Sequence, residues 1–124
     1  ISKVETVSKD KTGMVLNIAM NYGGRDEILR AVKLLCEEVK NNKITVDDID
    51  KEAISRKLYT TGQPDPDLII RPSGEYRTSN FLIWQSAYSE YVFMDNLLWP
   101  DFQTEDLDKA IIEYSARHRR FGGV

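Results

Sequence analysis

Two arginines and a serine in one short stretch are the side chains of this sequence best suited to bind an anion. Arg71 and Arg77 flank a turn that contains Pro72 and Gly74, and Ser79 follows them. Each guanidinium can donate paired hydrogen bonds to phosphate oxygens, and a serine hydroxyl adds a further donor. The stretch therefore predicts a site for a strongly anionic group such as a phosphate or a diphosphate.

The same residues also have a plainer interpretation. An arginine in a loop is usually a solvated surface charge, and Ser79 could serve only as the N-cap of a helix. Residue types and spacing alone leave both interpretations open.

The surrounding pattern predicts a strand before this loop and a helix after it. Residues 67–71 are apolar and rich in β-branched side chains, as in a buried strand. We expect a helix to begin at Ser79 and to continue through Gln85. Ligands of parallel α/β sheets bind at the carboxyl ends of strands, and a helix N-terminus suits phosphate. The predicted order of strand, basic loop and helix N-terminus therefore agrees with an anion site.

The remaining segments alternate between strand and helix patterns. Residues 14–20 and 91–95 are predicted to be buried strands, and residues 26–40 carry the apolar stripe of an amphipathic helix. Thr45 and Asp48 resemble a capping box, and a last helix is expected to begin at Thr104. This alternation predicts an α/β fold: a parallel sheet with flanking helices and right-handed crossovers.

The connection between residues 14–20 and the following helix contains Asn21, Gly23 and Gly24. A strand, two glycines and a helix could form a second phosphate site, but glycine pairs are common at plain turns, which favours a simple change of chain direction. On the helix itself, Cys36 lies on the apolar stripe and is predicted to be a small core residue. Core packing is likewise expected of four aromatic residues: Trp84, Tyr88, Tyr91 and Phe93.

Composition limits the classes of function. A chain of 124 residues is one domain or part of one. Its net charge of −3 argues against a general nucleic-acid binder, so anion binding must depend on local arginine placement. The single cysteine excludes an internal disulfide and fits a reducing cytoplasm. No apolar run approaches the roughly 18 residues of a membrane span.

Four stretches resemble motifs of the cis-prenyltransferases, most nearly those of bacterial undecaprenyl diphosphate synthases. They are residues 71–90, 99–102, 17–25 and 119–123. The resemblance runs over nearly the whole chain but covers only the C-terminal half of such an enzyme. It implies that residues 1–124 are the C-terminal part of a single cis-prenyltransferase domain. The Asp-Gly-Asn-Gly-Arg phosphate loop of the family's N-terminal half does not occur here.

The resemblance also implies a reaction and its ligands. Such enzymes use Mg²⁺ to condense isopentenyl diphosphate onto an allylic diphosphate such as farnesyl diphosphate, and the polyprenyl diphosphate product serves the cell-wall lipid carrier. By match to the family motifs, isopentenyl diphosphate would be bound by Arg71, Arg77, Thr78 and Ser79. Further candidate ligands are Glu75, Asn21, Gly23, Arg120 and Gly122. Glu90 would join the Mg²⁺ site.

The family resemblance further implies a cytoplasmic homodimer that contacts the membrane surface through its product. From the net charge, we expect no nucleic acid among its partners. Because the family's essential aspartate lies in the half that is absent here, we expect these residues alone to be inactive. One alternative is a noncatalytic cis-prenyltransferase-like partner subunit, although such subunits lose parts of the site that are present here. An unrelated nucleotide- or sugar-phosphate-binding module is less favoured, because neither a Walker loop nor a Gly-x-Gly-x-x-Gly fingerprint occurs.

Overall fold

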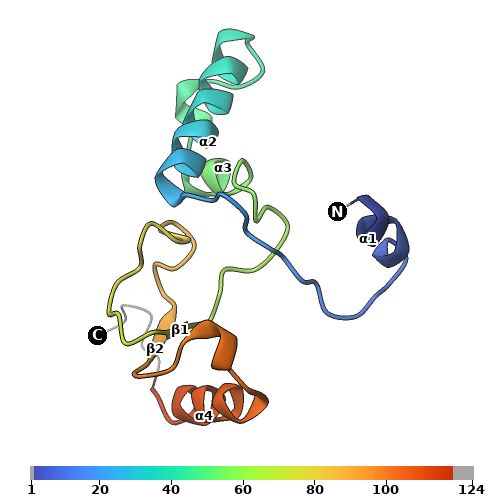
Figure 1. Ribbon diagram of the computed structural model, residues 1–124. Helices are drawn as coiled ribbons and strands as arrows, with labels where there is room; N and C mark the ends of the chain where they lie inside the picture. Colours follow the sequence, from blue (N-terminus) through green and yellow to red (C-terminus); the bar gives the residue numbers. More distant parts are fainter. Residues whose placement is uncertain (1, 119–124) are drawn as a thin grey trace.

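The computed structural model describes residues 2–118 as an α/β arrangement with two separate centres of packing. In chain order the elements are α1 (Ser2–Ser8), α2 (Gly24–Lys40), α3 (Lys51–Ser55), β1 (Leu68–Pro72), β2 (Glu90–Met94) and α4 (Thr104–Ser115), with short 3₁₀ helices at Val46–Asp48 and Trp99–Asp101. Helices α2 and α3 lie at one end of the molecule and β1, β2 and α4 at the other, while α1 stands apart (Figure 1).

Helix α2 forms where the apolar stripe predicts it and packs against α3. Its buried face includes Ala31 and Leu35, which lie one helical turn apart, and α3 contributes Ala53. Cys36 is exposed, so its predicted core position is wrong. The short helix α3 covers only a narrow strip of α2, and the remaining part of the stripe stays at the surface.

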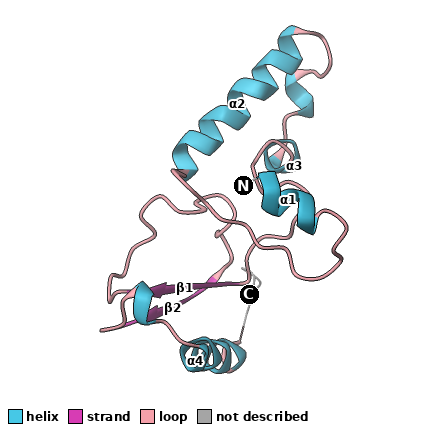
Figure 2. Cartoon of the chain, turned by 45° about the vertical axis from the view of Figure 1, so that its right-hand side comes forward, coloured by secondary structure: helices cyan, strands magenta, loops and turns pink. Residues whose placement is uncertain are grey.

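The two strands pair in parallel, as the sequence predicts. The register sets Leu68 opposite Glu90 and Arg71 opposite Phe93. Helix α4 packs against β2 (Figure 2). Val92 of the strand and Ala110 of the helix are almost completely buried. The small side chain of Ala110 lets the helix approach the strand closely, so this pair forms the centre of the second packing unit.

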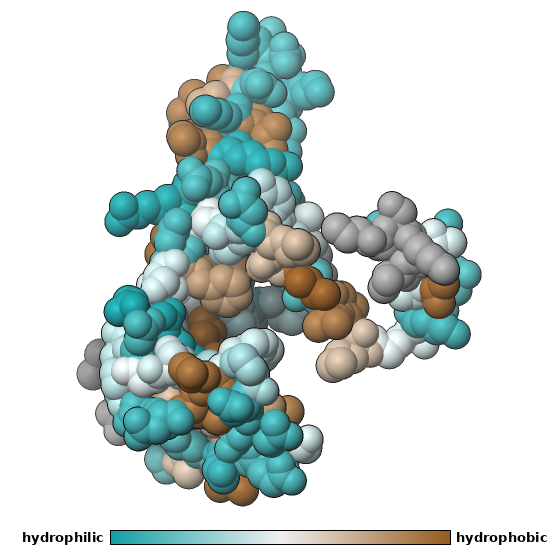
Figure 3. Space-filling model, viewed as in Figure 1, coloured by the Kyte–Doolittle hydropathy of each residue, from teal (hydrophilic) through white to brown (hydrophobic). Residues whose placement is uncertain are grey.

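The predicted strand at residues 14–20 does not form. The segment is extended, but it belongs to no sheet, and Met14 and Ile18 are 93% and 76% exposed. A strand requires a neighbour to satisfy its backbone groups, and no strand in the described part of the chain lies beside this one. Hydrophobic colour appears on this segment, which joins α1 to the rest of the molecule (Figure 3).

The predicted helix beginning at Ser79 is also wrong. The chain makes irregular turns there, and φ is 49° at Ser79, 66° at Asn80 and 46° at Leu82. These values are incompatible with a right-handed helix, in which φ is negative. Tyr88, which was expected in the core, is exposed in this segment. Long-range hydrogen bonds hold the segment instead, as described below.

The capping box predicted at Thr45 and Asp48 is confirmed. Thr45 donates to Asp48 Oδ2 from its backbone N–H and from its hydroxyl, each at 2.7 Å. These bonds lower the pKa of Asp48. Helix α4 begins at Thr104, as predicted.

The stability of the α2–α3 unit should depend on Leu35. Replacing Leu35, which is 3% exposed, with alanine should lower the free energy of unfolding by roughly 2–4 kcal/mol, since it leaves a cavity between the helices. The matched control is Leu29→Ala on the exposed side of α2, which should cost less than about 1 kcal/mol. Urea unfolding followed by circular dichroism measures both, and equal losses would contradict the described burial.

Candidate functional site

A hollow of about 240 Å³ lies at the carboxyl end of β1. Its polar lining comes from Arg71, Arg77 and Thr78, and its apolar lining includes Ile70 and Phe81. The carboxyl end of a parallel strand is where α/β folds place ligands, so this position agrees with the sequence-based expectation. The hollow therefore offers positive charge and a hydrophobic wall to the same ligand.

Arg71 projects into this region from the strand itself and has a donor without a partner. Its side chain is only 24% exposed, and Nη2 donates to Glu75 Oε2 at 2.8 Å. The Nε atom is buried, and no group among residues 2–118 accepts its hydrogen bond. An unsatisfied buried donor is costly, and a ligand oxygen would relieve that cost.

Glu75 holds the two arginines beside each other. Its carboxylate pairs with Arg71 through one oxygen and with Arg77 through the other. The hydrogen bond from Arg71 and then the charge of Arg77 keep the pKa of Glu75 below its usual value. Glu75 is thus an ionised bridge between two cations.

The loop that carries these residues is fixed to the end of β2. Ser73 N donates to Leu97 O at 2.6 Å, and Gly74 N donates to Met94 O at 3.0 Å. Gly74 has a φ of 65°, which glycine adopts without strain. A Cβ at this position would also touch the Asp95 side chain at 3.4 Å. The turn between the arginines therefore depends on glycine.

Glu90 lies away from the arginines. It is the first residue of β2 and stands opposite Leu68, three positions before Arg71 in the register. At about 3.3 Å per residue, this offset separates the two positions by roughly 10 Å along the sheet. Glu90 Oε2 accepts a hydrogen bond from Arg117 Nη1 at 2.8 Å. The structure thus brings Arg71, Arg77, Thr78 and Glu75 together, but not Glu90.

The remaining predicted site residues have varied positions. Ser79 is exposed and follows Thr78, and Asn21 is exposed beside a second hollow. A Cβ at Gly23 would lie 2.8 Å from Asn80 Nδ2, so this glycine permits a close approach of the chain. Arg120 and Gly122 lie outside the described residues. Their roles as ligands stay predictions.

The described residues contain no ready-made metal centre. No group of three or more histidine, cysteine, aspartate or glutamate side chains within residues 2–118 could hold an ion. Glu90 offers one carboxylate. Mg²⁺ commonly uses one or two protein carboxylates together with water and substrate phosphate oxygens, so a single glutamate fits it as a partial ligand set.

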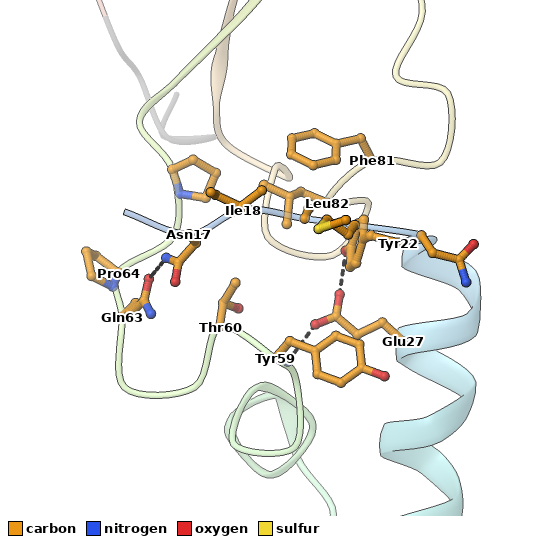
Figure 4. Close-up of a pocket in the computed structure, with 14 residues that line it drawn as sticks. Asn17, Ile18, Tyr22, Glu27, Tyr59, Thr60, Gln63, Pro64, Phe81 and Leu82 are labelled. Atoms are coloured by element: carbon orange, nitrogen blue, oxygen red, sulfur yellow. Dashed lines mark hydrogen bonds between the residues drawn. The ribbon is translucent and has the colours of Figure 1, made fainter. Parts of the chain in front are cut away.

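A larger hollow of about 540 Å³ lies beside the first turn of α2 (Figure 4). Ile18, Phe81 and Leu82 form much of its apolar lining, and Asn17 Nδ2 donates to Gln63 Oε1 at 2.6 Å across its edge. No lysine or arginine of the described chain lines it. This hollow suits a hydrocarbon group better than an anion, and Phe81 lines both hollows.

Sequence reasoning missed two buried polar residues near this hollow. Glu27 and Gln85 are 1% and 2% exposed, and Gln85 Nε2 donates to Glu27 Oε2 at 3.2 Å. The signal for Glu27 was present, because it precedes Ala31 and Leu35 at helical spacing on the apolar stripe. Gln85 carries no such signal, since its segment is irregular.

The fold and the site together fit the class of proteins that bind a small ligand with an anionic group and an apolar part. Comparison with known proteins makes this class specific. The family model described as putative undecaprenyl diphosphate synthase matches residues 1–122. The chain therefore belongs to this family of prenyltransferases.

Relatives and solved structures agree with this assignment. The chain is 58% identical over 117 residues to the isoprenyl transferase of Clostridium perfringens. This alignment covers 94% of this chain and 46% of that protein. It is 53% identical over 128 residues to the isoprenyl transferase of Streptococcus pneumoniae, covering 100% of this chain and 50% of that protein. The chain thus spans about half the length of the curated relatives that it matches.

Two crystal structures share the fold. A lavandulyl diphosphate synthase from Lavandula x intermedia, in complex with dimethylallyl diphosphate, superposes with a TM-score of 0.94 at 40% identity, covering 98% of this chain and 52% of that one. A probable undecaprenyl diphosphate synthase from Campylobacter jejuni gives a TM-score of 0.77 at 33% identity, covering 98% and 53%. The α/β fold expected from the sequence is confirmed.

The Glu75 bridge makes a prediction about pH. The carboxyl carbon of Glu75 should titrate by NMR with a midpoint below its ordinary value of 4.5, and Arg71→Ala should raise that midpoint. A folded-state pKa below the unfolded one means that the bridge adds stability above pH 4.5 and loses it as the pH falls through the lowered pKa. Asp48, whose pKa is lowered by its hydrogen bonds with Thr45, is the control and should keep its midpoint in Arg71→Ala. An unchanged Glu75 midpoint would refute the bridge.

Proposed function

We propose that this chain binds isopentenyl diphosphate as part of a cis-prenyltransferase. The complete enzyme condenses it onto an allylic diphosphate such as farnesyl diphosphate, and the resulting polyprenyl diphosphate serves the cell-wall lipid carrier. The observation that carries this proposal is the hollow at the end of β1. There, two guanidinium groups meet an apolar wall on a chain of the prenyltransferase family.

The proposed roles follow from the chemistry of the lining residues. Arg71 and Arg77 bind the diphosphate oxygens, and the unpartnered Nε of Arg71 takes one of them. The Thr78 and Ser79 hydroxyls add uncharged donors at the same edge. Phe81 contacts the five-carbon group, so one ligand satisfies both the cations and the apolar wall. Glu75, the other candidate ligand in this loop, orients both arginines through its ion pairs.

Asn21, Gly23, Arg120 and Gly122 are the remaining proposed contacts. Asn21 borders the larger apolar hollow, where an amide could reach the head of a second ligand. For Gly23, the crowding by Asn80 supports a mainly conformational role.

Mg²⁺ is proposed as the cofactor, with Glu90 as one ligand. When bound, the ion neutralises diphosphate charge and assists the departure of a diphosphate group. Glu90 is held in an ion pair with Arg117, so metal binding requires that the carboxylate exchange one cationic partner for another.

We propose that the complete enzyme is a homodimer in the cytoplasm that meets the membrane through its product. Exposed Leu107, Ile111 and Ile112 on α4 support an association surface. None of the helices within residues 2–118 is long and apolar enough to span a bilayer. The 124 residues alone are proposed to be inactive, since they correspond to about half of each isoprenyl transferase that they match.

The diphosphate site is tested by Arg77→Ala in a full-length chain that contains these residues. The variant should raise the KM for isopentenyl diphosphate roughly ten- to a hundredfold, the range expected when hydrogen bonds to a charged group are lost. Radiolabelled isopentenyl diphosphate incorporation with farnesyl diphosphate and Mg²⁺ measures it. Arg56→Ala, which removes an exposed arginine outside the hollow, is the control and should leave KM unchanged.

Two results of the same assay would overturn parts of the proposal. An intact, folded wild-type chain without incorporation would favour the noncatalytic partner subunit. Incorporation by the 124 residues alone would refute their proposed inactivity.

The metal role is tested by Glu90→Gln. The variant should raise the Mg²⁺ concentration for half-maximal activity by at least roughly tenfold, because it removes a carboxylate ligand. Glu113→Gln removes the other carboxylate that pairs with Arg117, so it controls for the loss of an ion pair at that arginine. Equal Mg²⁺ dependence in the two variants would argue against Glu90 as a ligand.

A further inference from the structure

Asn80, which is not among the proposed ligands, joins the loop that carries Arg77 to helix α2. Asn80 O accepts a hydrogen bond from Gly24 N at 2.7 Å, and Asn80 Oδ1 accepts one from Arg25 N at 2.9 Å. These two N–H groups belong to the first turn of α2, which has no intrahelical acceptors for them. Asn80 therefore caps a helix that lies 55 residues earlier in the sequence.

We propose that Asn80 is a positioning residue for Arg77, and that with Gly23 and Gly24 it forms a clasp that fixes the Arg77 guanidinium relative to Arg71. The proposal rests on the proposed function, because it concerns how the diphosphate site is assembled. It assigns to Asn80 no contact with the ligand.

The fit of the clasp depends on the absence of side chains at both glycines. A Cβ on Gly23 would lie 2.8 Å from Asn80 Nδ2. A Cβ on Gly24 would lie 2.5 Å from Ile83 Cγ1 and 3.1 Å from Asn80 O. The second of these positions is blocked partly by backbone, which a rotamer change cannot relieve. The two glycines thus let residues 80–83 lie directly against the start of α2.

Arg71 and Arg77 are held in place by different parts of the structure. The clasp therefore affects the position of Arg77 more than that of Arg71. Arg71 belongs to β1 and is held by the strand ladder. Arg77 lies in a loop whose upstream end is fixed to the sheet by Ser73 and Gly74. Its downstream end turns at Thr78, whose carbonyl accepts from Phe81 N at 3.0 Å, and meets α2 at Asn80. The distance between the guanidinium groups therefore depends on both anchors.

Two further hydrogen bonds, both from Gln85, keep the segment attached when the clasp is weakened. Gln85 Nε2 donates to Glu27 Oε2 and to Thr60 Oγ1, at 3.2 and 3.1 Å, and Gln85 is almost completely buried. Removing the Asn80 side chain should thus free the end of the segment that bears Arg77 without detaching the whole of it. This separates a positioning role from a general role in folding.

The test measures steady-state kinetics of Asn80→Gly in a full-length chain that contains these residues. Glycine retains the positive φ and the backbone acceptor, and only the Oδ1 cap is lost. We expect the KM for isopentenyl diphosphate to rise about tenfold, because small misplacements of a binding group are costly. The KM for farnesyl diphosphate and kcat should change by less than about twofold. Partial unfolding would lower kcat and leave both KM values unchanged.

A second variant adds a side chain on α2 at its contact with residues 80–83. Gly24→Ala should produce the same selective rise in KM, since its Cβ displaces residues 80–83. Gly13→Ala is the matched control, because nothing lies within 4 Å of a Cβ there. If Gly24→Ala does not fold, Asn80→Gly and the cycle described next still decide the question.

A double-mutant cycle with Arg77→Ala decides whether the clasp acts through Arg77. In that background, Asn80→Gly should have no further effect on the KM for isopentenyl diphosphate. Additive effects, or an unchanged KM in Asn80→Gly alone, would overturn the positioning role while leaving the proposed function intact. A folded wild-type chain that does not use isopentenyl diphosphate would overturn both.

Discussion

The structure depends on one buried carboxylate. Glu27 is 1% exposed and accepts hydrogen bonds from Tyr22 Oη at 2.5 Å, Tyr59 N at 2.6 Å and Gln85 Nε2 at 3.2 Å. A buried charge is tolerated only when such donors replace water. Burial and the neighbouring Glu27 raise the pKa of Tyr22, so its hydroxyl remains a donor. Through these bonds, one side chain joins the start of α2, the chain after α3 and the segment before β2.

Charged groups of the candidate site are paired before any ligand arrives. Arg71 and Arg77 share Glu75, and Glu90 pairs with Arg117. Partly exposed ion pairs of this kind contribute little to stability, so they can be exchanged at small cost. They also hold flexible side chains in defined places. A diphosphate that displaces part of Glu75's interactions would thus meet two arginines whose positions are already restricted.

Sequence patterns predicted the elements whose causes are local. The stripe of α2, the capping box at Thr45 and the β-branched run of β1 each carry their signal within a few residues. The strand predicted at residues 14–20 does not form, because a strand needs a neighbouring strand and none lies beside it in the described chain. The helix predicted at Ser79 does not form, because hydrogen bonds to the first turn of α2 determine the conformation of that segment. The Arg71, Arg77 and Glu75 cluster follows from spacing, whereas the distance of Glu90 from it depends on the strand register.

The irregular segment between the strands has a consequence for the order of folding. Helix α2 can form from local interactions, but the turns after Thr78 acquire fixed positions only when the first turn of α2 and the Glu27 carboxylate are in place. Parallel pairing of β1 with β2 also requires closure of the loop formed by this segment. The loop that carries Arg77 and Thr78 therefore takes its final shape only when contacts that are distant in the sequence have formed.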